Sequence, residues 1–474
     1  MGHDKTNKLS NVAKLLKLDK ERLIEFDNIY KNKALVDNDI KDNFFDNNSR
    51  DMSKQVRGTT LKDDIDFDRL QEVTNRIVGE LVSTTQSIDI DNQFKSWQQY
   101  PLIANSKPVT NEELKEIDIS VRPQLTGSLV WIDLKIPSYQ VLLEKYNDIL
   151  NSKSKQEKEI NTAMFRQGLD ILDLDPITYE MLSMNKNSMS HWLPQISESV
   201  NIHKFFKIPK TKIVKVPLPI LQLTRIAYSS INVATLKIID DWAMRVFDLD
   251  VTKSYFIKTG TYSSKFDFRN CVVKGKEEVE TLGEYLLFIH NQACMMAGPL
   301  TKPRPLIGAS TTNEWVVREF IEDVENNPTI YKGLPLHTEY RVFVDFDAKE
   351  ILGYTPYWYP EGMKKHFKDR AKTDDNFKHD YIVFEAYEDT LMDRYNSNID
   401  NVIKHVEELL PDTKLEGQWS IDIMQNGDDF WLIDMALANQ SALKECVPEG
   451  RLKSQEEFWI PDVSEIKYLE GRAE

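Results

Sequence analysis

The sequence has 474 residues, of which 41% are hydrophobic and 29% are charged, an ordinary composition for a folded protein. At roughly 150 residues per domain, this length predicts about three domains. The 60 Lys and Arg against 76 Asp and Glu give a net charge of −16, which argues against a general binder of nucleic acid or anionic membranes but leaves room for a local basic cleft. The 17 glycines are few for a fold that depends on several glycine-rich phosphate loops.

Cysteine usage and hydropathy indicate the cellular setting. Cys271, Cys294 and Cys446 are too few and too scattered for a disulfide framework or a cysteine metal motif, so we expect reduced thiols. The first residues lack an apolar signal core, and no uncharged apolar run approaches the ~18 residues of a membrane helix. The sequence therefore predicts a soluble, cytoplasmic protein that does not contact the membrane.

Residues 1–95 form a predicted helical N-terminal region. We expect one helix within 10–23, a loop in the Asp- and Asn-rich stretch 37–51, and a second helix that begins after the cap Asp66. The apolar stripe of the second helix consists of Phe67, Leu70, Ile77 and Leu81. The region is either an arm for a protein partner or a helical layer packed on the main body, and we favour the layer.

Residues 96–229 form a predicted mixed α/β region. The expected elements are a strand at 128–136, one or two helices within 138–172, and a proline- and aromatic-rich connection at 191–220 that enters a strand at 212–216. His191 and His203 are candidate catalytic bases by residue type alone. Because no partner group stands near either in the sequence, we expect them to have packing or surface roles.

The signals become clearer in residues 230–450, which precede a predicted tail at 451–474. The expected elements are a helix at 232–249, strands at 254–260 and 314–323, a hairpin at 339–359 turning near 347–349, a helix at 398–411, and a hairpin at 419–437. This order of helix, strand, strand, hairpin, helix and hairpin predicts an α+β fold with antiparallel sheets. It does not match the alternating strands and helices of a Rossmann domain.

The last hairpin carries two carboxylates, Asp422 and Asp434, at inward-facing positions of apolar strands. A three-residue loop at 427–429 would place them opposite each other on one face, whereas a two-residue turn would place them on opposite faces. Facing carboxylates need a proton or a cation between them, and magnesium is the natural cation for oxygen ligands, with phosphate oxygens completing its shell. The alternative is that each aspartate bonds only to local backbone or to a nearby Lys or Arg.

Cationic and apolar groups in the same half of the chain suit a nucleotide. Lys258 ends a strand and enters the hydroxyl-rich turn TGTYSSKFDF, which carries Lys265, a pattern that suits a polyphosphate. Residues 317–321 can offer edge backbone groups and an apolar wall to a flat base. Glu339 and Arg341 share one strand face, where they could hold ribose hydroxyls and a phosphate or form an ion pair on a wet sheet face.

In this order the motifs YFIK, VREFIED, EYRVFV and IDIMQNGDDFWLID resemble the ATP-grasp superfamily. The segment from HWLPQ to KVPLP, together with EYRVFV and FWLIDMA, looks most like the cell-division-cycle type of ATP-grasp protein and its bacterial and phage relatives. The resemblance covers roughly residues 190–445. It implies an ATP-grasp-like fold, with two antiparallel-sheet lobes and helices clasping a nucleotide, preceded by the helical N-terminal region.

The resemblance assigns roles to individual residues, with ATP and magnesium as cofactors. Lys258 would contact the α- and β-phosphates, Arg341 would bind phosphate, and Lys237, or in second place Lys215, would be the earlier phosphate lysine of the family. Lys258 and Arg341 are thus the expected catalytic residues, and Lys265 is a further expected ATP-binding cation.

The remaining roles concern the base, the ribose and the metal. Adenine would be held through the backbone of Glu319, Phe320 and Ile321, and ribose by Glu339. Magnesium would be held by Asp422, Asp434 and Asn439. The chain has Ala436 where the ligases of the family place a metal-binding Asn, and it has the serine-rich TYSSKF in place of a glycine-rich flap.

The function implied is an ATP- and magnesium-dependent ligase that activates a carboxylate, of unknown identity, as an acyl phosphate for attack by an amine or thiol. A first alternative is an ATP-binding assembly factor that meets a protein partner through residues 1–95. A second is a nucleic-acid-modifying or ligating enzyme, which the net charge disfavours unless the basic stretch 363–372 lines a cleft. We expect that stretch to be a solvated loop.

Overall fold

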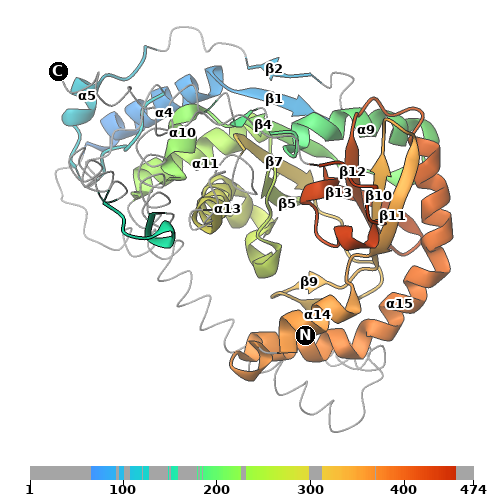
Figure 1. The fold of residues 1–474 in the computed structure, drawn as a ribbon. Coiled ribbons are helices and arrows are strands. Elements are labelled where there is room, and N and C mark those ends of the chain that lie inside the picture. The colour runs from blue at the N-terminus through green and yellow to red at the C-terminus, as the bar shows by residue number, and fades with distance from the viewer. Residues whose placement is uncertain are drawn as a thin grey trace, which may run out of the picture.

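The computed structural model describes residues 66–91, 96–100, 107–119, 121–127, 148, 151–158, 179, 182–183, 185–225, 231–297, 312–368 and 370–454. The predicted helix at 10–23, the loop at 37–51, the strand at 128–136 and most of the stretch 138–172 lie outside them. The described residues form a mixed α+β structure with sheets and helices in layers, as the sequence predicts (Figure 1). No helix among them combines the length and the apolar character that crossing a bilayer requires.

The first layer is a fully antiparallel six-stranded sheet in the order β2-β1-β4-β7-β5-β6. Its strands are β1 (Gln86–Asp89), β2 (Gln98–Gln99), β4 (Thr211–Lys215), β5 (Ser254–Thr259), β6 (Val272–Lys274) and β7 (Glu314–Glu319). Because strand residues alternate between faces, Ile257 and Val317 enter the helical core, whereas Phe256, Lys258 and Arg318 face the other way. The sheet joins segments from all three of the predicted regions before residue 450.

Helices cover one face of this sheet and form the first hydrophobic core with it (Figure 1). They are α4 (Phe67–Ser83), α10 (Leu218–Leu223), α11 (Val233–Phe247), α12 (Gly275–Glu280) and α13 (Leu282–Ala297). The predicted helix at 232–249 is thus confirmed as α11, with Leu236, Ile239 and Trp242 buried.

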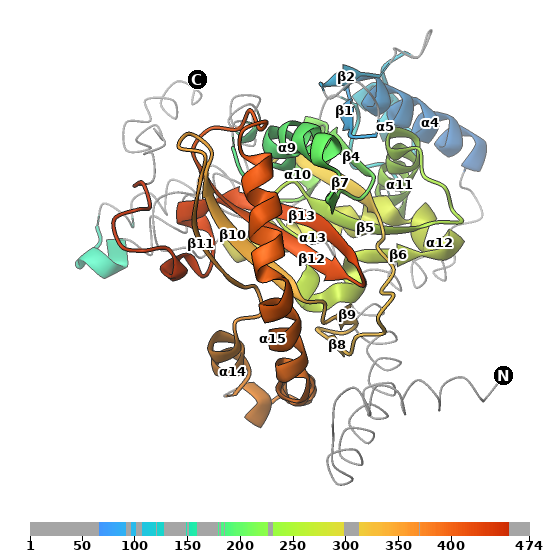
Figure 2. The ribbon, with the colours of Figure 1, turned by 90° about the vertical axis from the view of Figure 1, so that its right-hand side faces the viewer.

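The second layer is a five-stranded sheet in the order β11-β10-β12-β13-β3. Its strands are β3 (Phe206–Lys207), β10 (Glu339–Asp345), β11 (Glu350–Pro356), β12 (Gln418–Asn426) and β13 (Asp429–Leu437), and only the β13–β3 pair is parallel. Both predicted hairpins are present. Helices α9 (Met189–His203) and α15 (Asp375–Leu409) form the second core with it, and Figure 2 shows α15 running along the sheet.

Below this sheet in Figure 1 lies a smaller subdomain with its own core. It consists of the short pair β8 (Thr329–Ile330) and β9 (Leu334–Pro335), helix α14 (Pro360–Lys368) and the first half of α15. The basic stretch 363–372 lies on α14 and the following 3-10 turn η3 (Arg370–Lys372), so the expectation of a loop there is wrong. The apolar residues Met363 and Phe367 recur four positions apart, which lets the helix bury one side.

Three helical predictions need correction. The connection at 191–220 begins inside α9, which contains Pro194 in its interior; burial of Trp192, Leu193 and Ile196 outweighs the ~3 kcal/mol that an interior proline costs. The predicted order also lacked α13, whose pattern is obscured by buried polar residues such as His290. Finally, α15 begins at Asp375 rather than near 398, although it ends before Pro411 as predicted.

The second N-terminal helix forms as predicted and packs on the main body. The Asp66 side chain caps α4 by accepting from the Arg69 backbone amide at 2.9 Å, and at the far end Trp242 of α11 donates to Thr85 at 3.0 Å. Ile77 and Leu81 are buried in the first core. For residues 67–83, the interpretation as a packed helical layer is therefore confirmed.

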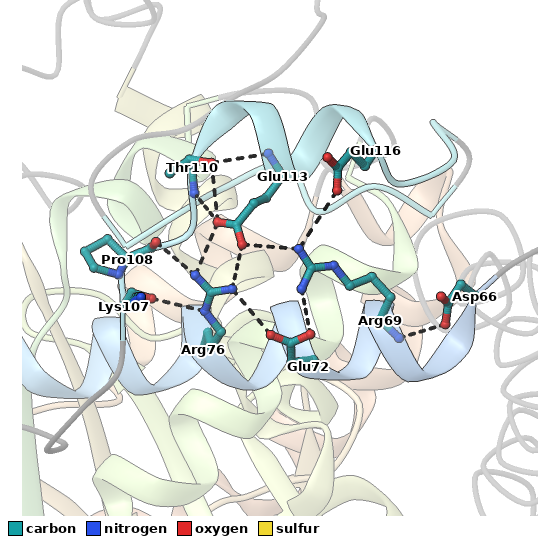
Figure 3. Close-up of polar contacts among 9 residues, drawn as sticks. All are labelled: Asp66, Arg69, Glu72, Arg76, Lys107, Pro108, Thr110, Glu113 and Glu116. Atoms are coloured by element: carbon teal, nitrogen blue, oxygen red, sulfur yellow. Dashed lines mark hydrogen bonds and ion pairs between the residues drawn. The ribbon is translucent and has the colours of Figure 1, made fainter.

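An ion-pair network ties α4 to the short helix α5 (Asn111–Lys115), as Figure 3 shows. Glu113 of α5 accepts from Arg76 at 2.8 Å and from Arg69 at 3.2 Å. It also closes a capping box with Thr110. Hydrogen bonds, above all from Arg76, lower the pKa of Glu113 to about 2. These contacts fix a segment near residue 110 onto the N-terminal helix.

Gly283 marks the closest approach of α13 to α11. A Cβ atom at this position would lie 2.5 Å from the carbonyl oxygen of Ile239, a backbone atom that cannot move aside cheaply. We expect Gly283→Ala to destabilise the protein by about 1–3 kcal/mol, as overpacking does. Gly362→Ala is the matched control, because its Cβ would meet only Tyr359 at 3.5 Å on the exposed helix α14; we expect it to stabilise by roughly 0.5–1 kcal/mol. Urea denaturation of both variants measures the difference, and equal effects would contradict it.

Candidate functional site

The turn of the last hairpin contains two residues, the second of the two alternatives that the sequence leaves open. Asn426 pairs with Asp429, which leaves Gly427 and Asp428 as the turn. Gly427 has a φ of +64°, a conformation that glycine adopts without strain. On its own, this turn would place the two site aspartates on opposite faces of the hairpin.

A β-bulge in β13 reverses that outcome. Ile423 pairs with Leu432, but the next pair is Asp422 with Asp434, so Ile433 is an extra residue on one strand. The extra residue shifts the alternation by one position and brings Asp434 directly opposite Asp422. The predicted juxtaposition of the two carboxylates is therefore present, although it arises from a bulge and not from the turn.

Each aspartate is bound by a cation that the sequence analysis assigned to phosphate. Arg341 donates to Asp422 in bidentate fashion, Nε to Oδ1 and Nη2 to Oδ2, both at 2.7 Å. Lys258 reaches across from the six-stranded sheet to Asp434, with distances of 3.0 and 3.2 Å from Nζ to the two carboxylate oxygens. Lys258 is only 2% exposed whereas Asp434 is 43% exposed, so this pair links the two sheets through a buried lysine and a partly exposed aspartate.

The pocket beside these pairs holds about 910 Å³ of atom-free space, its open mouth included. Eight predicted site residues line it, namely Lys258, Lys265, Glu319, Phe320, Ile321, Glu339, Asp422 and Asp434. Apolar lining comes from Phe256, Phe268, Phe320, Ile321 and Met424. The pocket lining thus combines charged and apolar side chains, the two kinds of contact that a nucleotide needs.

The other predicted site residues do not line the pocket. Arg341 lies behind Asp422, whose carboxylate does. Lys237 is half-exposed on α11 and pairs with Asp241 at 2.6 Å, and Lys215 stacks over Trp97, so the structure brings neither to the pocket. Asn439 lies in the 3-10 turn η4 (Ala438–Gln440) that follows β13, with its side-chain oxygen buried and without a hydrogen-bond partner.

Tyr357 contacts two of the site cations. It was not among the predicted site residues. The Lys265 ammonium lies 4.3 Å from the centre of its ring and hydrogen-bonds to its hydroxyl, and the Arg341 guanidinium lies 4.6 Å from the ring centre. Burial pushes the pKa of Lys265 down, but Tyr357, Glu339 and Asp422 outweigh it and hold the pKa above its ordinary value. Lys265 therefore stays charged inside the protein.

Glu339 is a buried carboxylate in the pocket wall, 7% exposed. Burial raises the pKa of Glu339 to about 7, with Lys265 opposing that shift and Asp422 adding to it. This side chain therefore changes its charge close to neutral pH, unlike an ordinary glutamate.

Arg318 is a pocket residue for which no side-chain role was predicted. It is 4% exposed, lines the pocket, and donates to the carbonyl oxygen of the bulge residue Ile433 at 2.5 Å. Burial lowers the pKa of Arg318 to about 10, so it remains protonated at neutral pH. In the sequence, Arg318 is recognisable as a charged residue within the otherwise apolar strand WVVREF. Burying such a charge is costly unless it has hydrogen-bond partners, so the pattern indicates a specific role.

The donor set fits a magnesium ion. Asp422 and Asp434 offer carboxylate oxygens of the kind that magnesium prefers, once Arg341 and Lys258 release them. The buried, unpartnered oxygen of Asn439 has suitable chemistry but does not line the pocket. Across the described ranges, no cluster of three or more His, Cys, Asp or Glu side chains could hold a metal, so the fit rests on the two carboxylates.

The remaining candidates lie away from the pocket. His191 contacts the Ser183 carbonyl at 2.8 Å and His203 contacts Asp412 at 2.7 Å, and neither lines the pocket, as expected. On the basic helix α14, Lys364 pairs with Glu388 at 2.7 Å. Cys271 and Cys446 are free thiols, as predicted.

No protein-family model and no curated protein matches the sequence. Among solved structures, the fold is similar to Cdc123 from Schizosaccharomyces pombe and to a C-terminally truncated form of the same protein. Each comparison has a TM-score of 0.31 and 16% identity, and covers 57% of this chain and 96% of the other. Because these values are low, the functional proposal does not rest on these comparisons.

Proposed function

We propose that the pocket binds ATP together with Mg²⁺, as the resemblance to the ATP-grasp superfamily implies. The observation that carries the proposal is the convergence of two opposed carboxylates with four buried or nearly buried cations around one pocket. Lys258, Lys265 and Arg318 line the pocket, and Arg341 lies behind Asp422. ATP carries about four negative charges, so a partly buried site must supply at least this much positive charge.

The pocket divides into a base end and a phosphate end. Phe256, Phe268 and Phe320 give the base end an apolar wall. The amides of Glu319 and Phe320 already donate to the carbonyl oxygens of Lys210 and Ser254, so a backbone contact to the base would fall to Ile321, just beyond the end of β7. Glu339 would hold the ribose hydroxyls. The phosphate end is where Lys258 meets Asp434, because this pair lies between the two sheets.

Binding requires an exchange of partners. Lys258 and Arg341 are engaged by carboxylates, so phosphate oxygens must take over these cations. Asp434 and Asp422 are then left without partners, a state that is costly in a buried site. Magnesium held by the two aspartates would offset that charge and supply positive charge to the phosphates.

For the chemistry, we propose phosphoryl transfer from ATP to a substrate carboxylate, followed by attack of an amine or thiol on the acyl phosphate. The contribution of the chain is to align the phosphates with Lys258 and Lys265 and to stabilise the developing charge with Arg341. No nucleophilic side chain is needed for this reaction. The assembly-factor alternative stays open because Ala436 stands where the ligases carry a metal-binding Asn.

Hydrogen exchange tests the binding proposal. Adding a non-hydrolysable ATP analogue with Mg²⁺ should protect the backbone amides of β5, of the segment 319–321 and of the last hairpin, while the exposed helix α14 stays unchanged. Absence of protection at these places would refute the site. ADP release in the presence of candidate carboxylate and amine substrates then separates a ligase from an assembly factor, which would bind ATP tightly without turnover.

A further inference from the structure

The geometry of the site depends on one local irregularity. In an unbulged ladder with the same two-residue turn, Asp422 would pair with Ile433, and Asp434 would point to the opposite face. The extra residue of a bulge is left outside the regular ladder of hydrogen bonds. The position of Asp434 therefore depends on whatever holds the bulge.

Arg318 contacts the bulge from the other sheet. Its Nη1 donates to the Ile433 carbonyl oxygen at 2.5 Å, and its Nε donates to Thr211 Oγ1 at 3.1 Å. The Thr211 hydroxyl donates in turn to the Pro209 carbonyl at 2.6 Å, which leaves its lone pairs for the guanidinium. A chain of three hydrogen bonds thus runs from β4 through Arg318 to the bulge of β13.

Arg318 lacks the direct ion pair that the other buried arginine of the site possesses. Arg341 forms a bidentate pair with Asp422, whereas Arg318 is 4% exposed, forms no salt bridge within the described part of the chain, and leaves Nη2 unbonded. The charge of Asp434 offsets only part of the effect of burial on the pKa of Arg318. A buried charge without a direct ion pair is costly, and the hydrogen bond to the bulge is the contact that accounts for an arginine here.

We propose that Arg318 is a positioning residue: it holds the β-bulge at Ile433 and thereby keeps Asp434 opposite Asp422 for a divalent cation. The inference rests on the proposed function only in taking the two aspartates as metal ligands. Arg318 acts through the backbone carbonyl of Ile433 and is not assigned a contact with the ligand.

Metal binding without nucleotide gives a direct readout. We expect Arg318→Met and Arg318→Lys to weaken binding of Mn²⁺, followed by electron paramagnetic resonance, by about 10-fold or more, as loss of a group that orients a metal ligand does. Lysine keeps the charge but cannot bridge Thr211 and Ile433 together, so both variants should behave alike.

Deleting Ile433 tests whether Arg318 acts on metal binding through the β-bulge. The shortened strand would place Asp434 opposite Asp422 in a regular ladder, without any bulge. We therefore expect the deletion variant to bind Mn²⁺ within about threefold of the unmodified protein, and Arg318→Met in that background to cost little further affinity. If the deletion variant does not fold, Thr211→Val decides instead, because loss of its hydroxyl should weaken Mn²⁺ binding in the same direction.

The outcomes separate this inference from the proposed function. If the unmodified protein binds neither Mn²⁺ nor the ATP analogue, the proposed function fails. If it binds both and either Arg318 variant keeps full Mn²⁺ affinity, the positioning role is overturned while the function stands. A loss that persists undiminished in the Ile433 deletion, or an unchanged affinity in Thr211→Val when that variant decides, also overturns it.

Discussion

Asp434→Asn is expected to strengthen binding of ATP in the absence of magnesium and to remove the benefit of adding magnesium. In the unmodified protein, phosphate must displace the carboxylate of Asp434 from Lys258, to which it lies at 3.0 Å. Removing the charge frees Lys258, and because Asp434 is 43% exposed the gain is modest, about fivefold. With one of two carboxylates lost, affinity in excess Mg²⁺ and any ATP turnover should fall by more than about 100-fold.

Isothermal titration with ATP, in EDTA and in excess Mg²⁺, measures both effects. Asp429→Asn is the matched control, because Asp429 lies on the same strand, is 46% exposed and pairs with Lys207 at 2.6 Å away from the pocket lining. The control should match the unmodified protein in both titrations. A fall in metal-free affinity for Asp434→Asn would contradict the exchange of ion pairs.

Glu339→Gln is expected to remove a pH dependence of stability. With a pKa of about 7 in the folded state against 4.5 in an ordinary glutamate, Glu339 keeps its proton in the folded protein while the unfolded chain loses it. Stability contributed by this group is therefore fully present below pH 4.5 and is lost as pH rises to 7, by roughly 3 kcal/mol. The glutamine variant lacks this loss.

Urea denaturation at pH 4.5, 6 and 8 provides the measurement. Relative to the unmodified protein, Glu339→Gln should gain stability progressively between the first and the last pH. Glu350→Gln serves as the control, since Glu350 lies exposed at the start of β11 and pairs with Arg451. A difference between Glu339→Gln and the unmodified protein that stays constant with pH would show that the burial of Glu339 does not govern its charge.

The elements around the site could be predicted from the sequence because each has a strong local pattern. The strands of both hairpins alternate regularly, and Asn426-Gly427 is a strong turn signal. Eight of the predicted site residues also line one pocket. Lys258, Asp422 and Asp434 among them could be found because each is a charged residue within an apolar strand, and a buried charge needs a partner.

Other features depend on distant contacts and could not be predicted. The bulge at Ile433 is stabilised by Arg318, 115 residues away, and Tyr357 gains its role from meeting Lys265, 92 residues away. Lys237, predicted as a phosphate-binding lysine, does not line the pocket, because it lies on the exposed side of α11 next to Asp241. The interior proline of α9 is tolerated only because tertiary burial supports the helix, which a local pattern does not reveal.

The order of the strands constrains how the protein matures during synthesis. Strand β1 pairs with β4 more than a hundred residues later, and Lys258 meets Asp434 across 176 residues. Such long-range closures make folding slow compared with that of a helical bundle. A nascent chain that has left the ribosome only as far as β7 therefore has the six-stranded sheet without the five-stranded one. Lys258 on β5 then has no Asp434 to pair with until β12 and β13 emerge. Truncated translation products would consequently be substrates for chaperones and proteases and could not compete for nucleotide.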